Sequence, residues 1–348
     1  MLSEKRMTVK RTLPFLLIGL LIFVAYLYFF VGIPEMLTSI QRIDLFYYSL
    51  AVAALLLSML AYSLTWQNFL RPLSVKIPLR KTFLFSWIGV FVDLLIPAES
   101  ISGDAAKAYL MTKESGENAG KVVASVMGHR ILSMVITLST LIIGSISLFV
   151  LRYELPAFVS NLILLVTVGT TISLVFIFLL CVKENVTQRL VDLLLRFFVF
   201  ILRGRLKLAT LRSKARKGLD VFHQSIEALG GNPRSFVRPV FFSIVSWFFS
   251  ALLSFLVFVS LDNPLSFLLV TIVYSISCAI QNIPLGVPGE VGLVEIVMTT
   301  LYGLLGVPVA ISAAATVLIR VLTVWLRLFL GFVAVQWIGI KTLIGGSR

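Results

Sequence analysis

The chain contains nine long apolar stretches separated by short polar segments, and this pattern decides what it can fold into. The stretches lie at about 12–31, 44–68, 82–96, 122–150, 158–182, 237–260, 265–283, 293–305 and 309–340. Most of them have the roughly 20 residues that a helix needs to cross a hydrocarbon core about 30 Å thick. With 59% hydrophobic residues, 13% charged residues and a mean hydropathy of +1.01, the chain is more apolar than a soluble domain. The sequence therefore predicts an all-α polytopic membrane protein, with one transmembrane domain over residues 1–348.

The positive charges are distributed unevenly, and this orients the chain. Of the 30 Lys and Arg residues, twelve lie between residues 183 and 238, four before the first stretch, four between 69 and 81, three between 97 and 121 and two at the C-terminal end, while Arg130, Arg320 and Arg327 lie within apolar stretches. If all these segments are cytoplasmic, only Arg42 and Arg152 lie on the other side, which is the positive-inside pattern. We therefore expect a multi-pass protein of the cell membrane with cytoplasmic N- and C-termini. The net charge of +14 then reflects orientation in the membrane, and no nucleic-acid partner is expected.

Two segments, 96–104 and 283–290, interrupt apolar sequence with proline, glycine and carboxylates. Unwound backbone and ionisable side chains are tolerated at membrane depth only where they are buried in protein or line a watery cavity. As helices, 82–96 and 293–305 would span only about 22 and 20 Å at about 1.5 Å per residue. Interrupted segments in matching positions of two halves indicate a transport site.

The expected fold has about six full transmembrane helices and two re-entrant helical hairpins in an inverted-topology repeat. Its halves are 44–182 and 237–340, and the hairpins enter from opposite faces. The alternative is that both hairpins cross fully, without inversion, but the lysines that follow 82–96 would then face outward. Between the halves, 183–236 is expected to be a basic cytoplasmic linker. Its amphipathic helix is either solvated or held against anionic lipid.

Two polar strips follow the hairpins at helical spacing. They consist of Ser125, His129, Ser133 and Thr137 with Arg130 beside them, and of Thr316, Arg320, Thr323 and Arg327. An arginine that faced lipid would cost at least about 3 kcal/mol, so these arginines must face protein or water. Either they pair with carboxylates of the hairpins, or their guanidinium groups bind the oxygens of a lipid phosphate. For Arg130 the candidate carboxylates are Asp93, Glu99 and Asp104, and for Arg320 they are Glu290 and Glu295.

The candidate site is drawn from these strips and hairpins. The residues expected to meet a lipid headgroup are Arg130, Arg320, Glu295, Glu290, Asp104, Lys107, His129 and Arg327. The residues expected to shape the hairpin loops are Pro97, Gly103, Pro284, Gly286, Pro288, Gly289 and Gly292. Arg327 ranks lower among the arginines because its long side chain can reach the membrane interface.

No sequence pattern indicates a cofactor or a metal. The chain has no Walker-type phosphate loop, which disfavours nucleotide-driven pumping, and only two histidines and two cysteines, which disfavours a zinc site. One rival function is an intramembrane transferase acting on a lipid-linked headgroup or sugar, with Glu290 or Glu295 as base. Another is a non-transporting membrane partner protein that docks through the basic linker. Membrane lipids are the expected partners, and a second copy of the chain or a lipid-modifying enzyme is an open alternative.

Several short motifs resemble a known family. They are Gly103-Asp104 with Lys107, Gly128-His129-Arg130, and the run Pro288-Gly289-Glu290-Val291-Gly292-Leu293-Val294-Glu295 followed by Arg320. They are similar to the transmembrane region of lysylphosphatidylglycerol synthase, also called the flippase-like domain family. The resemblance spans nearly the whole chain and implies a membrane protein that handles polar lipids, since this domain of the synthases moves the aminoacylated lipid between leaflets.

The resemblance also assigns residues. It implies that Glu295 matches the glutamate after the family's proline-glycine motif and that Arg130 and Arg320 match its two helix arginines. The chain departs from the pattern at Ser102, where a glycine is expected before Gly103, and at Glu290, where a second glycine is common. No aminoacyl-transferase domain follows the last apolar stretch. We therefore predict a non-enzymatic lipid flippase or scramblase that moves a polar, anionic or lipid-phosphate-linked lipid between leaflets.

Overall fold

The computed structural model describes residues 28, 33–96, 101–150, 152, 156–201, 208–231, 233–281 and 288–345, and within them every regular element is a helix. Within the described ranges, five helices are long and apolar enough to cross a membrane: Leu45–Leu70, Ala119–Val150, Ala157–Val182, Arg234–Ser260 and Val309–Ile338. The predicted all-α membrane architecture is therefore confirmed. The first predicted stretch, 12–31, lies outside the described residues apart from Tyr28.

The apolar stretches predicted the helix limits closely. The long helices are α3 (Leu45–Leu70), α6 (Ala119–Val150), α7 (Ala157–Val182), α10 (Val237–Ser260) and the continuous run α13 (Val309–Arg320), η4 (Val321–Leu326) and α14 (Arg327–Gly345). The shorter elements are α2 (Ile33–Gln41), α4 (Leu79–Leu95), α5 (Ile101–Ser115), α8 (Glu184–Ile201), α9 (Leu208–Gly230), η2 (Pro233–Phe236), α11 (Phe267–Ile280), η3 (Pro288–Glu290) and α12 (Leu293–Leu304).

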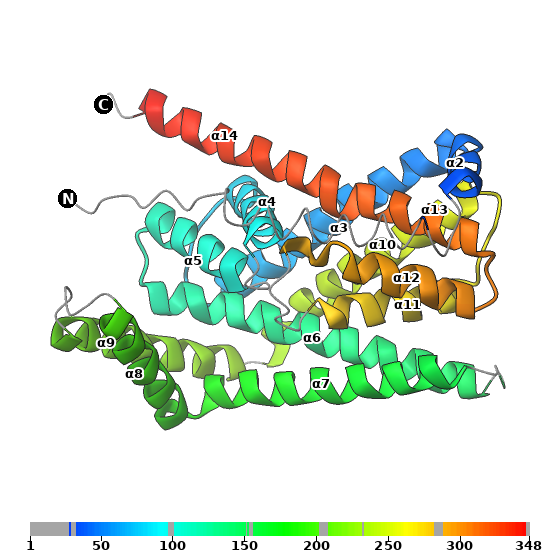
Figure 1. Ribbon diagram of the computed structural model, residues 1–348. Helices are drawn as coiled ribbons and strands as arrows, with labels where there is room; N and C mark the ends of the chain where they lie inside the picture. The colour runs from blue at the N-terminus through cyan, green and yellow to red at the C-terminus, as the bar shows by residue number, and fades with distance from the viewer. Residues whose placement is uncertain are drawn as a thin grey trace.

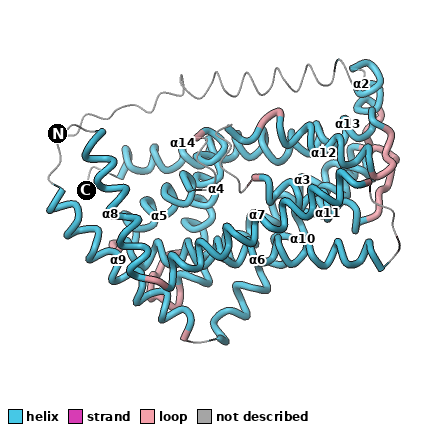
Figure 2. The backbone as a smooth tube through the Cα atoms, turned by 60° about the horizontal axis from the view of Figure 1, so that its bottom comes forward, coloured by secondary structure: helices cyan, strands magenta, loops and turns pink. Residues whose placement is uncertain are grey.

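The short helix pairs lie toward opposite ends of the bundle. Helices α4 and α5 lie toward the end that also carries α8 and α9, whereas α11 and α12 lie toward the end that carries α2 (Figures 1 and 2). Helix α7 exposes large apolar side chains such as Leu165 and Ile172, which are 68% and 64% exposed. Such a broad apolar surface suits contact with lipid.

Helices from the two halves of the chain pack on each other in matching pairs. Helix α3 runs along α10, α4 packs against α14, and α11 packs against α6. Both of the latter contacts are made at a glycine, because a Cβ atom on Gly331 would lie 2.5 Å from Cβ of Phe91 and one on Gly144 would lie 2.8 Å from Ile272. Small residues at such crossings let membrane helices approach closely.

Within the first short pair, a carboxylate joins the two arms. Asp93, near the end of α4, accepts hydrogen bonds from the Ser102 hydroxyl at 2.9 Å and from the Gly103 amide at 2.5 Å. The α4 backbone also approaches Gly103 closely, since a Cβ there would lie 2.3 Å from the Gly89 carbonyl oxygen. The first turn of α5, whose amides lack partners within the helix, is thereby tied to α4.

The connection before α12 uses left-handed backbone. Gly289, Glu290 and Gly292 have φ values of 58°, 47° and 94°, a region that costs glycine little but other residues more. Pro288 begins the short 3-10 turn η3. The predicted loop residues Pro97, Pro284 and Gly286 lie outside the described residues.

Candidate functional site

A cavity of about 330 Å³ lies in the middle of the bundle and is lined by both halves of the chain. Its walls come from α3, α4 and α6 of the first half and from α10, α11, η3, α12 and the run α13 to α14 of the second. This volume lies at the lower end of the range of about 300–1,000 Å³ that is typical of ligand sites.

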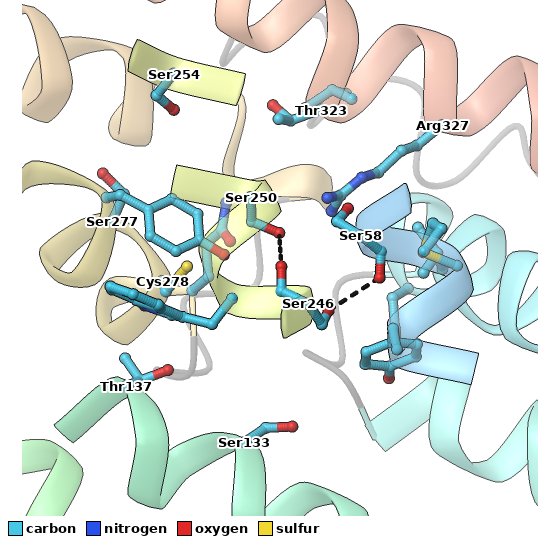
Figure 3. A pocket seen from close by; sticks show the side chains of 18 of the residues that line it. Ser58, Ser133, Thr137, Ser246, Ser250, Ser254, Ser277, Cys278, Thr323 and Arg327 are labelled. Carbon is cyan, nitrogen blue, oxygen red and sulfur yellow. Dashed lines mark hydrogen bonds between the residues drawn. The ribbon is translucent and has the colours of Figure 1, made fainter. Parts of the chain in front are cut away.

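Hydroxyl groups dominate the polar part of the walls (Figure 3). They belong to Ser58, Tyr62, Thr65, Ser133, Thr137, Ser243, Ser246, Ser250, Ser254, Tyr274, Ser277 and Thr323. Several of them donate to backbone carbonyl groups; Ser246, for example, donates to the Ser58 carbonyl at 3.0 Å and Ser250 to the Ser246 carbonyl at 2.9 Å. The cavity is therefore polar although it lies between apolar helices.

Arg327 extends from the start of α14 toward the serines of this cavity (Figure 3). Its Nε is buried without a hydrogen-bond partner, and it forms no ion pair with any described residue. The preceding turn, Val321–Leu326, is a π-helix, a form that is frequent at functional sites. The cavity thus contains a guanidinium group without a carboxylate partner in the described part of the chain.

Arg320 also lines the cavity, but its guanidinium group is already bound. Its Nε donates to Glu295 Oε1 at 2.6 Å, and its Nη2 donates to the Gly289 carbonyl at 2.5 Å. The other oxygen of Glu295 accepts from the Gly292 amide at 2.8 Å, which caps the start of α12. With Arg320 and Glu295 each only 4% exposed, this buried pair ties α13 to the turn before α12.

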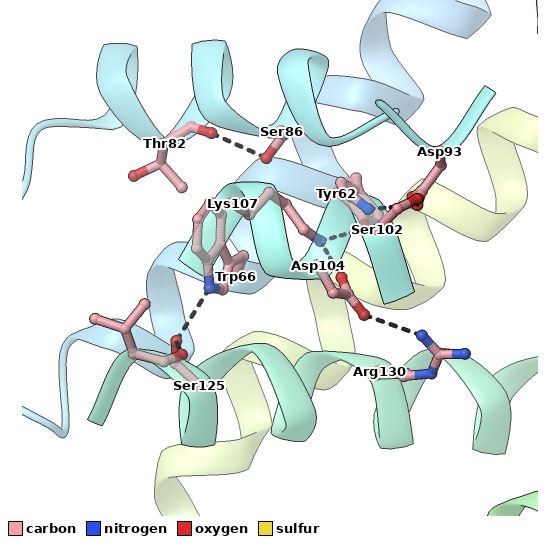
Figure 4. Close-up of polar contacts among 12 residues, drawn as sticks. Tyr62, Trp66, Thr82, Ser86, Asp93, Ser102, Asp104, Lys107, Ser125 and Arg130 are labelled. Atoms are coloured by element: carbon pink, nitrogen blue, oxygen red, sulfur yellow. Dashed lines mark hydrogen bonds and ion pairs between the residues drawn. The ribbon is translucent and has the colours of Figure 1, made fainter. Parts of the chain in front are cut away.

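A second charged cluster lies beside the cavity in the first half (Figure 4). Asp104 pairs with Lys107 at 2.7 Å and with Arg130 at 3.1 Å. The Lys107 ammonium group donates to the Tyr62 hydroxyl at 3.0 Å and lies over the rings of Tyr62 and Trp66, 5.2 and 5.5 Å from their centroids. These contacts hold α5 against α3 and α6.

The structure brings only some of the predicted headgroup residues to the cavity. His129, Arg320, Glu290 and Arg327 line it, together with the loop residue Gly289, whereas Arg130, Asp104, Lys107 and Glu295 do not. Gly103 and Gly292 serve the close approach of α4 to α5 and the cap of α12. Arg130 pairs with Asp104 and Arg320 with Glu295, which is one of the two alternatives that the sequence left open. Binding of a headgroup by any of these residues stays a prediction.

Sequence reasoning missed the hydroxyl wall of α10. Ser243, Ser246, Ser250 and Ser254 are spaced three or four residues apart and therefore share one face of the helix. That spacing was the available signal, but it was hidden in a stretch interpreted only as apolar. Trp247, on the same helix, also lines the cavity.

Comparison with known proteins gives a match over most of the chain. The family model described as the lysylphosphatidylglycerol synthase TM region matches residues 16–331. Among curated proteins, a UPF0104 membrane protein of Pyrococcus horikoshii is 24% identical over 320 residues, which cover 90% of this chain and 93% of the relative. Another, from Methanothermobacter thermautotrophicus, is 25% identical over 89% of this chain and 90% of its own length. A third, from Methanocaldococcus jannaschii, is 23% identical over 92% of this chain and 93% of its own length.

Proposed function

This chain belongs to the family of the lysylphosphatidylglycerol synthase transmembrane region, and from that premise we propose that it moves a lipid with a polar, anionic headgroup between the leaflets of the cell membrane. The observation that carries the proposal is the hydroxyl-lined central cavity with the Arg327 guanidinium inside it. An uncompensated charge in a membrane interior is costly. An anionic headgroup would supply the missing counter-charge during each passage.

The size and position of the cavity fit the transport of a headgroup whose acyl or isoprenoid tails stay in lipid. Only the polar part of such a molecule needs to leave the hydrocarbon, because the tails are already soluble there. The cavity volume of about 330 Å³ suits a headgroup. Its walls come from both halves of the chain, so a movement of one half against the other would change access to it.

We propose that the short helix pairs are re-entrant hairpins and that the halves form an inverted-topology repeat. The support is the matched packing, in which α4 meets α14 and α11 meets α6 while α3 and α10 run together. A two-fold relation between the halves produces pairs of this kind. The end that carries α8 and α9 would be cytoplasmic because the basic linker belongs to it (Figure 1).

We propose transport without covalent chemistry on the lipid. The transferase alternative requires a carboxylate base at the cavity, and Glu295 is instead held by Arg320 and by the Gly292 amide. Glu290 does line the cavity, so the transferase alternative rests on that residue. Incubation of the protein with a lipid acceptor and a soluble donor would detect it as product formation.

The test of transport is leaflet exchange in reconstituted vesicles. Purified protein would be placed in phosphatidylcholine vesicles with tail-labelled fluorescent phosphatidylglycerol, and dithionite would bleach only the label in the outer leaflet. We expect protein-dependent loss of the protected inner-leaflet signal. Arg327→Met should slow that loss at least tenfold, whereas Arg327→Lys should keep part of the rate because it keeps the charge.

The matched control is Arg152→Met, because Arg152 is exposed at the turn after α6 and lies away from the cavity. It should exchange lipid at the wild-type rate. Wild-type protein that moves no anionic lipid, or an Arg327→Met protein as fast as wild type, would refute the proposal.

A further inference from the structure

We propose that the headgroup is a sugar or another polyol carried on a phosphate, an inference that rests on the proposed function because it concerns the same cavity. The support for this proposal is the set of hydrogen-bond donors and acceptors that the cavity walls present. The cavity presents unfilled donors in two places and acceptors on several sides. A ligand that satisfies it must therefore bring both strong acceptors and several donors.

The unfilled donors are Arg327 and Trp247. The Nε of Arg327 and the indole Nε1 of Trp247 are both buried without a hydrogen-bond partner among the described residues, and both side chains line the cavity. An indole N–H can only donate, and a guanidinium group cannot accept. Buried groups of this kind are costly unless they are satisfied. A phosphate is the strongest partner for the guanidinium group, and a neutral ligand oxygen suits the indole.

The acceptors are the wall hydroxyls, whose own protons are already used. Five of them donate to backbone carbonyl groups: Ser58 to Leu55 at 2.8 Å, Ser246 to Ser58 at 3.0 Å, Ser250 to Ser246 at 2.9 Å, Ser277 to Val273 at 2.8 Å and Thr323 to Ile319 at 2.9 Å. A hydroxyl group that donates its proton still has lone pairs that accept. Ser250 also has a hydrogen bond with the Tyr274 side chain. The other four oxygens suit a ligand with several O–H or N–H donors, which a fully ionised phosphate lacks.

The arrangement of the acceptors favours hydroxyl groups over an amine. They come from α3, α10, α11 and η4 and so surround the cavity (Figure 3), whereas an ammonium group concentrates its three donors at one point. Two carboxylates line the cavity, and neither is free: Asp93 accepts from Ser102 and Gly103, and Glu290 has an interaction of its own. A ring or chain of hydroxyl groups distributes its donors as the walls distribute their acceptors.

The test measures binding, so that it does not depend on transport. Purified protein in detergent would be titrated by calorimetry with glucose 1-phosphate, with inorganic phosphate and with phosphoethanolamine. We expect glucose 1-phosphate to bind at least tenfold more tightly than the other two. Ser277→Ala and Trp247→Phe should each reduce that preference at least threefold while leaving the affinity for inorganic phosphate unchanged. Arg327→Met should weaken binding of all three probes.

Two substitutions away from the cavity serve as matched controls. Ser147→Ala removes a hydroxyl that also donates to a carbonyl of its own helix, and Trp337→Phe changes a tryptophan that is 56% exposed. Neither should alter the preference. A control variant that alters the preference for glucose 1-phosphate would show that the effects of the cavity variants do not arise from contacts inside the cavity, which would overturn the proposal.

The other outcomes separate the two proposals. Phosphoethanolamine binding as tightly as glucose 1-phosphate would overturn the polyol assignment in favour of an amine, and equal binding of inorganic phosphate would leave only an anion site. Absence of binding by all three probes would also overturn it. Tight binding of glucose 1-phosphate by a protein that moves no lipid in vesicles would refute transport and leave the ligand class standing.

Discussion

The buried pair between Arg320 and Glu295 allows a quantitative test of what holds the start of α12 against α13. Glu295 accepts from Arg320 and from the Gly292 amide, and both side chains are 4% exposed. Glu295→Ala would leave the guanidinium group buried with one carbonyl partner, and loss of one member of such a pair costs about 3–5 kcal/mol. Glu295→Gln keeps an oxygen for the amide but loses the charge. It should cost less, about 1.5–3 kcal/mol.

The assay is unfolding of the purified protein in mixed micelles of mild detergent and dodecyl sulfate, followed by tryptophan fluorescence. Glu114→Ala is the matched control, because it breaks an ion pair with Lys81 in which both side chains are more than one third exposed. Solvent screening limits that loss to below about 1 kcal/mol. The expected order of destabilisation is therefore Glu295→Ala, then Glu295→Gln, then Glu114→Ala.

The double variant Glu295→Leu with Arg320→Met shows whether the single variants lose stability because the interaction is missing or because one charge is left buried without a partner. Apolar replacement of both members of a buried pair is often nearly neutral. The double variant should therefore be more stable than either single variant. A double variant whose loss equals the sum of the two single losses would refute the reasoning, as would a Glu295→Ala loss no larger than that of Glu114→Ala.

Four further substitutions, one of them a control, test other contacts by the same unfolding measurement. Gly331→Val should destabilise by several kcal/mol, since its side chain would overlap α4, while Gly169→Ala on α7, with nothing within 4 Å, should be neutral or stabilising by up to about 1 kcal/mol. Asp104→Asn should destabilise by about 3 kcal/mol or more, because it removes the charge that two partly or fully buried cations share. Asp44→Ala, which removes the cap that binds the second amide of α3 at 2.8 Å, should cost about 0.5–2 kcal/mol.

The positions and limits of the helices could be predicted from the sequence because both depend on local chemistry. An apolar run of fixed length predicts a helix, and proline or a capping residue ends it. Helix α10 begins and ends at the predicted residues 237 and 260, and Asp44 caps α3 where the polar sequence stops. Positive charge outside the apolar runs predicts which segments share a side of the membrane, and this orientation stays a prediction.

The partners of the charged side chains were not accessible in the same way. Three carboxylates were candidates for Arg130, and Asp104 binds it because of how α5 packs on α6. Arg327 could equally have reached the interface or the interior, and helical spacing does not distinguish these directions. The serines of α10 escaped notice because serine is nearly neutral in hydropathy, so a polar face inside an apolar run leaves a weak signal.

Helix α4 packs on α14, and α11 packs on α6. Because these partners lie far apart in the sequence, the packing has a consequence for biosynthesis. The contact between Phe91 and Gly331 can form only after the ribosome has extended the chain from residue 91 to residue 331, which is 240 additions (331 − 91) and takes about 12 to 48 s at about 5–20 residues per second. During that interval α4 lacks the neighbour that covers its outer face. The Asp93 cap on α5 and the cluster around Asp104, which lie wholly within the first 130 residues, are the contacts that can hold the nascent hairpin together until α14 arrives.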